Sequence, residues 1–178
     1  MRNGSKGLRM MAVAALASGA MLAGHARPAA AQRMSDANIL QAEMTANQNE
    51  VASARYVQAH AHAAAVRTYA AMLVRDHSAG LSQNRATARA AHVTPRAMPG
   101  DDSAAKQREL MQRLRSLHGA ALDKAYIDHA VDDHREDIQK AHTMESQAHA
   151  AAVRRMVHGT LPVLQKHLDR ALALQKRM

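Results

Sequence analysis

The sequence predicts an all-α protein, a bundle of long amphipathic helices, from its composition, its apolar periodicity and an internal repeat. Its 178 residues include no Phe, Trp or Cys and only three Tyr. A core must therefore be built from Ala, Leu, Val, Ile and Met, which suits closely packed helices better than sheets. The hexapeptide HAAAVR occurs at residues 62–67 and again at 149–154, 87 positions later. We interpret the two copies as the same structural point in two copies of one αα-hairpin.

The N-terminal region has the layout of a secretory signal peptide. Basic residues precede an apolar run over residues 10–24, and the small residues that follow offer a cleavage site after Ala31. The apolar run is too short for a convincing membrane span. We predict a signal peptide over residues 1–31 and one mature domain over 32–178, exported to the periplasm and either free there or associated with a membrane.

Apolar positions at helical spacing predict four long helices in two hairpins. If the helix that contains Val57 ran straight on, its apolar stripe would point almost opposite to the stripe through Val66, so the chain must turn near residues 61–64. A smaller change of phase falls at the second HAAAVR. Each hexapeptide is therefore expected to open the second helix of a hairpin, and the two later long helices are expected at about 120–146 and 149–176.

The connection between the hairpins, residues 92–118, is far longer than two antiparallel neighbours need. Its Pro and Gly residues break the helical pattern, and a short helix through Leu110 and Leu114 is expected to end near Gly119. A single long crossover of this kind is typical of ferritin-like folds. The predicted fold is therefore an all-α, ferritin-like four-helix bundle of two αα-hairpins with a long crossover containing a short extra helix.

Ionisable side chains stand where the apolar stripes place the core. Glu50 lies at the centre of the first stripe, Asp76 and His77 flank the centre of the second, and His134 and His167 lie on the third and fourth. Glu50 and His77 are equidistant from the first predicted turn, as His134 and His167 are from the second, so the two pairs occupy corresponding levels. Buried ionisable groups each cost several kcal/mol unless they are paired or bound to an ion.

Two interpretations of this inner polar set remain open. One is a metal site in which Glu50, His77 and His134 are ligands and His167 or Asp76 is a further ligand. A carboxylate with up to three imidazoles suits Zn, Fe, Mn, Ni or Cu. The other is a hydrogen-bonded network that sets the register of the helices, with Asp or Glu holding each His.

Other function classes find little support in the sequence. The chain has no E-x-x-H di-iron motif, no strong nucleophile motif and no glycine-rich phosphate loop, so no enzyme and no organic cofactor are predicted. The net charge of +9 becomes +5 without the four basic residues that precede Ala31. Arginines without interleaved aromatic residues, in an exported chain, do not predict nucleic-acid binding. Seven scattered histidines are expected at the surface: His60, His62, His92, His118, His142, His149 and His158.

Four segments, NQNEVASARYVQ, VRTYAAMLVRDHSAGL, LHGAALDKAYIDHAVDDHREDI and VRRMVHGTLPVLQKHLDRALAL, resemble the exported bacterial family called domain of unknown function 4142. Its members are often labelled outer-membrane proteins. The resemblance covers about residues 35–174 and implies a ferritin-like four-helix bundle and export, but no activity, because none is agreed for the family. The family pattern falls here on Glu50, Asp76, His77, Tyr126, Asp133, His134, Leu161, Pro162 and His167.

The chain departs from the family pattern at four positions. It has Leu122 and Tyr69 where Phe is usual, His129 at an apolar position, and Glu43 where a small residue is common. Two functions follow as hypotheses. The first is a periplasmic bundle that binds a transition metal ion. The second is a non-catalytic envelope module whose basic faces meet an anionic membrane surface or an envelope protein. The sequence does not indicate an oligomeric state.

Overall fold

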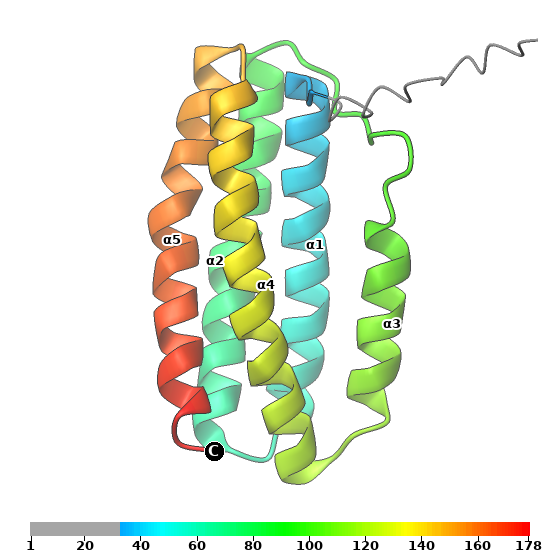
Figure 1. Ribbon diagram of the computed structural model, residues 1–178, viewed down its shortest axis with the longest axis vertical. Coiled ribbons are helices and arrows are strands. Elements are labelled where there is room, and N and C mark those ends of the chain that lie inside the picture. The colour runs from blue at the N-terminus through cyan, green and yellow to red at the C-terminus, as the bar shows by residue number, and fades with distance from the viewer. Residues whose placement is uncertain (1–32) are drawn as a thin grey trace, which may run out of the picture. The chain divides into compact units, whose positions relative to one another are not determined.

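Five helices and no strand make up residues 33–178, the part of the chain that the computed structural model describes. The predicted signal peptide lies outside this part. The long helices are α1 (Asp36–His60), α2 (Ala64–Ala90), α4 (Gly119–Gln147) and α5 (Ala151–Gln175), and they lie side by side, with the short α3 (Ser103–Arg115) outside them (Figure 1). None of these helices combines the length and the apolarity that crossing a membrane requires.

The helices pair as two hairpins, as the sequence predicts. Helix α1 packs along α2, and α4 packs along α5. The hairpins join mainly through α2 and α5, whereas α1 and α4 make few contacts with each other. One expectation was wrong: Gly119 does not end the short helix, which stops at Arg115, but is the first residue of α4. Its φ of 57° lets the chain turn there, a conformation that favours glycine.

Each hairpin turn is held by an aspartate from the other hairpin. The Asp123 carboxylate, near the start of α4, accepts hydrogen bonds from the backbone N–H groups of His62 (2.8 Å) and Ala63 (2.7 Å) between α1 and α2. These groups precede α2, where the first N–H groups of a helix lack partners of their own. The Asp123 side chain thus caps the first turn and ties it to the second hairpin.

The same contacts recur in the second turn, 87 positions later. Asp36, at the start of α1, accepts hydrogen bonds of 2.9 Å from both His149 N–H and Ala150 N–H. In each copy of HAAAVR the final arginine also donates a 2.8 Å hydrogen bond to the carbonyl of the residue before the hexapeptide. The structure therefore confirms that the repeated hexapeptide marks one structural point in two equivalent hairpins. The beginning of each hairpin lies against the turn of the other.

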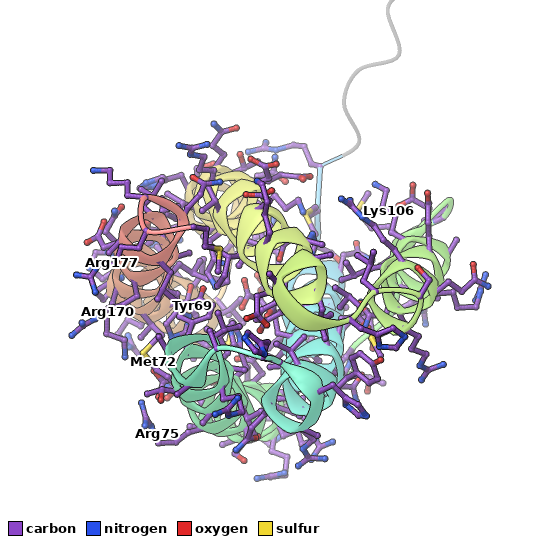
Figure 2. All side chains as sticks on the ribbon, turned by 90° about the horizontal axis from the view of Figure 1, so that it is seen from below. Tyr69, Met72, Arg75, Lys106, Arg170 and Arg177 are labelled. Atoms are coloured by element: carbon purple, nitrogen blue, oxygen red, sulfur yellow. The ribbon has the colours of Figure 1, made fainter. Side chains whose placement is uncertain are left out.

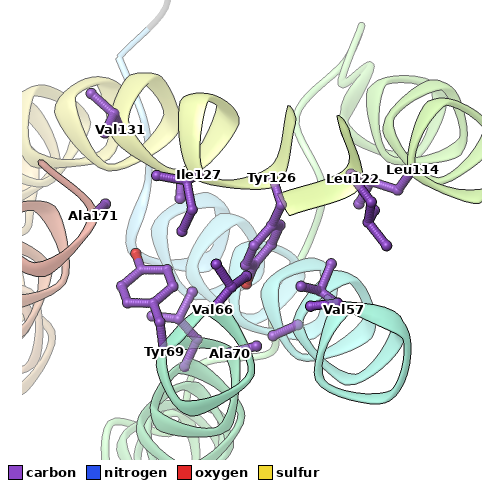
Figure 3. Close-up of a cluster of buried hydrophobic side chains, with 14 of the residues drawn as sticks. Val57, Val66, Tyr69, Ala70, Leu114, Leu122, Tyr126, Ile127, Val131 and Ala171 are labelled. Carbon is purple, nitrogen blue, oxygen red and sulfur yellow. The ribbon is translucent and has the colours of Figure 1, made fainter. Parts of the chain in front are cut away.

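The apolar core is divided into two clusters that share a set of equivalent positions. One cluster surrounds the first turn, where Val57, Val66 and Tyr69 meet side chains from the start of α4 (Figure 3). The other surrounds the second turn and meets the start of α1. Residues separated by 87 positions fill equivalent places: Ala54 and Ala141, Val57 and Met144, Ala61 and Ala148, Val66 and Val153, Tyr69 and Met156, Ala70 and Val157, Ile39 and Tyr126, Leu40 and Ile127.

We expect Asp123→Asn to lower the free energy of unfolding by about 1–3 kcal/mol, because an amide has only one oxygen acceptor and would leave one of the two partly buried backbone N–H groups of the turn without an acceptor. The matched control is Asp132→Asn, whose side chain is 80% exposed. Urea unfolding followed by circular dichroism measures the difference. Equal stability of the two variants would show that the Asp123 carboxylate does not hold the turn.

Candidate metal centre

Three helices bring three histidines together in the middle of the bundle. His77 comes from α2, His134 from α4 and His167 from α5. Both His134 and His167 are fully buried, and His77 is 7% exposed. The centroids of the three rings are 5.1–5.9 Å apart. One ring nitrogen of each histidine lies within 4.8 Å of the corresponding nitrogens of the other two.

The second nitrogen of each ring is held by a hydrogen-bond acceptor. Nδ1 of His77 lies 3.0 Å from Asn47 Oδ1, and Asn47 Nδ2 donates to the Glu43 carbonyl, which fixes the orientation of the amide. Nδ1 of His134 lies 2.9 Å from the Ala130 carbonyl. Nε2 of His167 lies 3.0 Å from Asp76 Oδ2. Because all three acceptors lack a proton to give, each of these ring nitrogens must carry the hydrogen.

The remaining nitrogens therefore carry lone pairs when the rings are neutral. They are Nε2 of His77, which is buried and has no hydrogen-bond partner among residues 33–178, Nε2 of His134 and Nδ1 of His167. The last two are only 3.3 Å apart. Two lone pairs at this distance repel unless a proton or a cation lies between them. Zn–N bonds of about 2.0–2.1 Å in a tetrahedral site place the ligand nitrogens about 3.3–3.4 Å apart.

Burial keeps the three imidazoles neutral at ordinary pH. It lowers the pKa of His77 to about 3, helped by the charges that His167 and His134 would carry. It lowers the pKa of His167 to about 4, although the hydrogen bond to Asp76 acts in the opposite direction. The pKa of His134 is also lowered by burial. A neutral imidazole is the form that coordinates a metal ion, so little proton competition is expected at this centre.

Asp76 orients His167 from outside the histidine group. Its carboxylate also contacts Lys166 (2.6 Å) and Arg75 (2.8 Å). Partial burial opposes ionisation, but the hydrogen bonds from Lys166, His167 and Arg75 prevail and lower the pKa of Asp76. An ionised carboxylate on the far nitrogen of a histidine fixes the tautomer and raises the basicity of the other nitrogen, as is usual behind histidine ligands.

A second group of potential ligands lies on the facing sides of α1 and α4. This group consists of Glu50, His129 and Asp133. Each offers one potential ligand atom, and the three atoms lie within 4.8 Å of one another. Burial raises the pKa of Glu50 well above its ordinary value, and the neighbouring charge of Asp133 raises it further. The predicted ligands thus divide: His77, His134 and His167 come together, whereas Glu50 belongs to this second group.

These carboxyls line a cavity of about 830 Å³ together with Glu43 of α1 and Asp137 of α4. Burial and the charge of Asp137 raise the pKa of Glu43 to about 7. Burial and the charge of Asp133 raise the pKa of Asp137 to about 6, against the attraction of Lys140. His77 lines the same cavity, so the cavity reaches the edge of the histidine group.

Sequence reasoning did not select Glu43, His129, Asp133 or Asp137 as site residues. His129, Asp133 and Asp137 recur every four residues and so share one face of α4. Asp137 could have been predicted from the repeat, because it lies 87 positions after Glu50 and is its equivalent in the second hairpin. The apolar stripe of α4 did not mark His129 or Asp133, because that stripe runs through Val131, His134 and Ile138, on the opposite face of the helix.

The histidines and arginines that the sequence predicts for the surface are exposed. All seven scattered histidines are exposed, and so are the arginines of residues 33–178. Figure 2 shows Arg75, Arg170 and Arg177 pointing away from the helices, whereas Tyr69 points between them.

The pair that corresponds to His134 and His167 in the first hairpin is Asn47 and Gly80, each 87 positions earlier. A Cβ atom at Gly80 would lie 2.7 Å from Asn47 Oδ1, which is the atom that accepts from His77. Glycine at this position therefore makes room for the amide that orients His77. In the second hairpin these positions hold His134 and His167. In the first hairpin they hold Asn47, which orients His77, and Gly80, which makes room for Asn47.

The fold and the site define a helical bundle with a buried cluster of three histidines beside a carboxylate-lined cavity. The chain belongs to the family described as Domain of unknown function (DUF4142), which matches it over residues 21–174. No curated protein and no solved structure matches the chain.

We expect Gly80→Ala to lower the free energy of unfolding by about 1–3 kcal/mol, because the added methyl group displaces the Asn47 amide. The matched control is Gly159→Ala, where a Cβ meets nothing within 4 Å and helix propensity predicts a gain of up to about 1 kcal/mol. Urea unfolding compares the two, and ¹⁵N NMR follows the Nδ1 proton of His77, which should lose protection only in Gly80→Ala. Equal effects of the two substitutions would contradict the close approach.

Proposed function

We propose that the protein binds a transition metal ion through His77, His134 and His167. The observation that carries this proposal is the 3.3 Å separation of two ring nitrogens, Nε2 of His134 and Nδ1 of His167, whose partner nitrogens already donate to acceptors. The unpartnered Nε2 of His77 supplies a third lone pair. Burial of three imidazoles with converging lone pairs is unfavourable unless a cation is shared among them.

The donor set favours particular metals. Three neutral imidazoles suit Zn²⁺, Cu²⁺, Ni²⁺ or Fe²⁺ better than Mg²⁺ or Ca²⁺, which prefer oxygen ligands. Each histidine has the outer hydrogen bond that usually accompanies a metal-bound imidazole: to an amide, a backbone carbonyl and a carboxylate. Three protein ligands leave a fourth position for water or another ligand, and His77 borders the cavity from which it would come.

A ferritin-like four-helix bundle is the fold that we propose for this centre. Support comes from two antiparallel hairpins, the long connection through α3 and ligands projecting inward from facing helices. The competing interpretation is a network that sets helix register, with one proton between His134 and His167. That interpretation is weakened by burial, which lowers the pKa of both rings.

We also propose that the chain is exported to the periplasm and associates weakly with an anionic membrane surface or an envelope protein. The signal-like pattern of residues 1–31 and the exposed arginines support this proposal. We expect periplasmic fractions of a Gram-negative host to contain a chain beginning at Gln32. Binding to anionic vesicles should weaken as salt rises from about 50 mM to about 500 mM, because the Debye length falls several-fold. A chain that stays unprocessed in the cytoplasm would contradict export. Vesicle binding that does not change with salt would contradict electrostatic association with the membrane.

For the metal itself, we expect full-length protein purified without a histidine tag to hold one Zn²⁺ per chain tightly, and His134→Ala to lose that equivalent. The reason is the loss of a central ligand from a three-ligand set. Zn²⁺ affinity is measured by competition with a chromophoric chelator. Asp76→Asn should weaken affinity by about 10–100-fold, because His167 keeps its position but loses the charge behind it.

His142→Ala is the matched control, because His142 is exposed on the same helix as His134. Binding is also measured at pH 5.5, where His77 and His167, with pKa values of about 3 and about 4, stay neutral and keep their lone pairs for the metal. Equal Zn²⁺ affinity in His134→Ala and His142→Ala would show that the histidine group is a structural network.

A further inference from the structure

Glu50, His129 and Asp133 form a ligand group separate from the three histidines. Glu50 is on α1, and His129 and Asp133 are one turn apart on α4. Asp133 precedes His134 by one residue, which on a helix is a rotation of about 100°. The two neighbouring side chains therefore serve different groups, His134 toward α5 and Asp133 toward α1.

This group lacks the hydrogen-bond donors that two nearby carboxylates require. Glu50 is only 6% exposed. Its carboxyl and that of Asp133 are close enough to share a hydrogen bond if one of them is protonated. Among residues 33–178, however, no N–H or O–H donor forms a hydrogen bond to either carboxyl, and Lys140 contacts Asp137 and Glu136 instead. A buried carboxylate without a donor or a counter-ion is costly.

The cavity gives a small cation access to the group. Glu50, His129 and Asp133 all line it, and the last two are partly exposed. The cavity has a volume of about 830 Å³, and residues from all five helices line it, so the space beside the group is not filled by side chains. A bound ion could therefore keep water molecules as additional ligands.

We infer that Glu50, His129 and Asp133 form a second cation site, distinct from the histidine centre, for a divalent ion such as Mn²⁺ or Fe²⁺. Two carboxylates supply the hard oxygen donors that Mn²⁺ accepts, and one imidazole adds a donor that suits Fe²⁺. A divalent cation also balances the two negative charges that Glu50 and Asp133 carry when both are ionised. The nitrogen-only centre and this oxygen-rich site would therefore select different metals within one bundle.

A shared proton is the alternative occupant of this site. A proton between Glu50 and Asp133 would also relieve their repulsion, but it leaves the His129 ring without a role. The two occupants differ in one measurable respect, because only the cation site responds to added metal.

The test is a Mn²⁺ titration of full-length protein loaded with one equivalent of Zn²⁺, with free Mn²⁺ followed by its electron paramagnetic resonance signal. We expect one bound Mn²⁺ per chain. Asp133→Asn and His129→Gln should each weaken binding at least about tenfold, since losing a ligand costs no less than losing its outer-sphere partner. The controls, Asp132→Asn and His142→Gln, make the same chemical changes at exposed positions and should stay within about twofold of the wild type.

Asp133→Asn also tests the site without metal. Because it removes one of two facing carboxylates, the metal-free variant should melt at a higher temperature than the wild type, while Mn²⁺ should no longer raise its melting temperature. Equal Mn²⁺ affinity in Asp133→Asn and Asp132→Asn would overturn the inference and favour the shared proton.

The histidine variant separates this site from the proposed function. His134→Ala should lose tight Zn²⁺ binding and keep Mn²⁺ binding. If His134→Ala abolishes Mn²⁺ binding as well, the two groups form one centre and the separate second site is wrong. If it loses neither metal, the histidine centre fails, whereas the second site still stands on the Asp133 and His129 variants.

Discussion

The reciprocal capping of the two turns is the constraint on which the rest of the structure depends. Asp36 and Asp123 each stand at the beginning of one hairpin and accept two backbone N–H groups from the turn of the other. Because both contacts must form at once, the hairpins can slide neither way along their axes. The middle levels of the four long helices are thereby brought together, and polar residues at those levels must face one another. The position of the histidine group therefore follows from contacts at the two ends of the bundle.

The duplication shows how one scaffold acquired an asymmetric interior. The apolar clusters around the turns have kept equivalent residues, whereas the polar layer between them has diverged. Asn47 and Gly80 stand where the other hairpin has His134 and His167, and Glu50 stands where it has Asp137. This difference is consistent with packing physics, since the turn regions need only apolar side chains of suitable volume. In the polar layer each buried donor must meet an acceptor, so a buried histidine depends on neighbouring residues that can accept its hydrogen bond, as His77 depends on Asn47.

Much of the fold could be predicted from the sequence, and the site only in part. The turn near residue 62, the helix pairing and the exposure of the scattered histidines followed from periodicity, because apolar stripes report directly which face of a helix is buried. The level of His77, His134 and His167 followed from the repeat. The separation of Glu50 from these histidines did not follow, because position along a helix does not give direction to within one side chain. The cavity could not be predicted either, because residues from all five helices line it and the apolar stripes do not give the distances between helices.

The two ligand groups are best understood through charge. The histidine group is neutral, with Asp76 outside it balanced by Lys166 and Arg75, so a cation there would be held by lone pairs alone. The group of Glu50, His129 and Asp133 is different, because two carboxylates face each other and no basic side chain of residues 33–178 forms an ion pair with either of them. Burial raises the pKa of Glu50 and of Asp137, which shows how poorly this region solvates negative charge. A metal bound in the cavity would offset the repulsion between two carboxylates. A metal bound at the histidines would instead relieve the close approach of their nitrogen lone pairs. If both proposed sites bind a cation, they would do so for different physical reasons and should therefore differ in the ion they prefer.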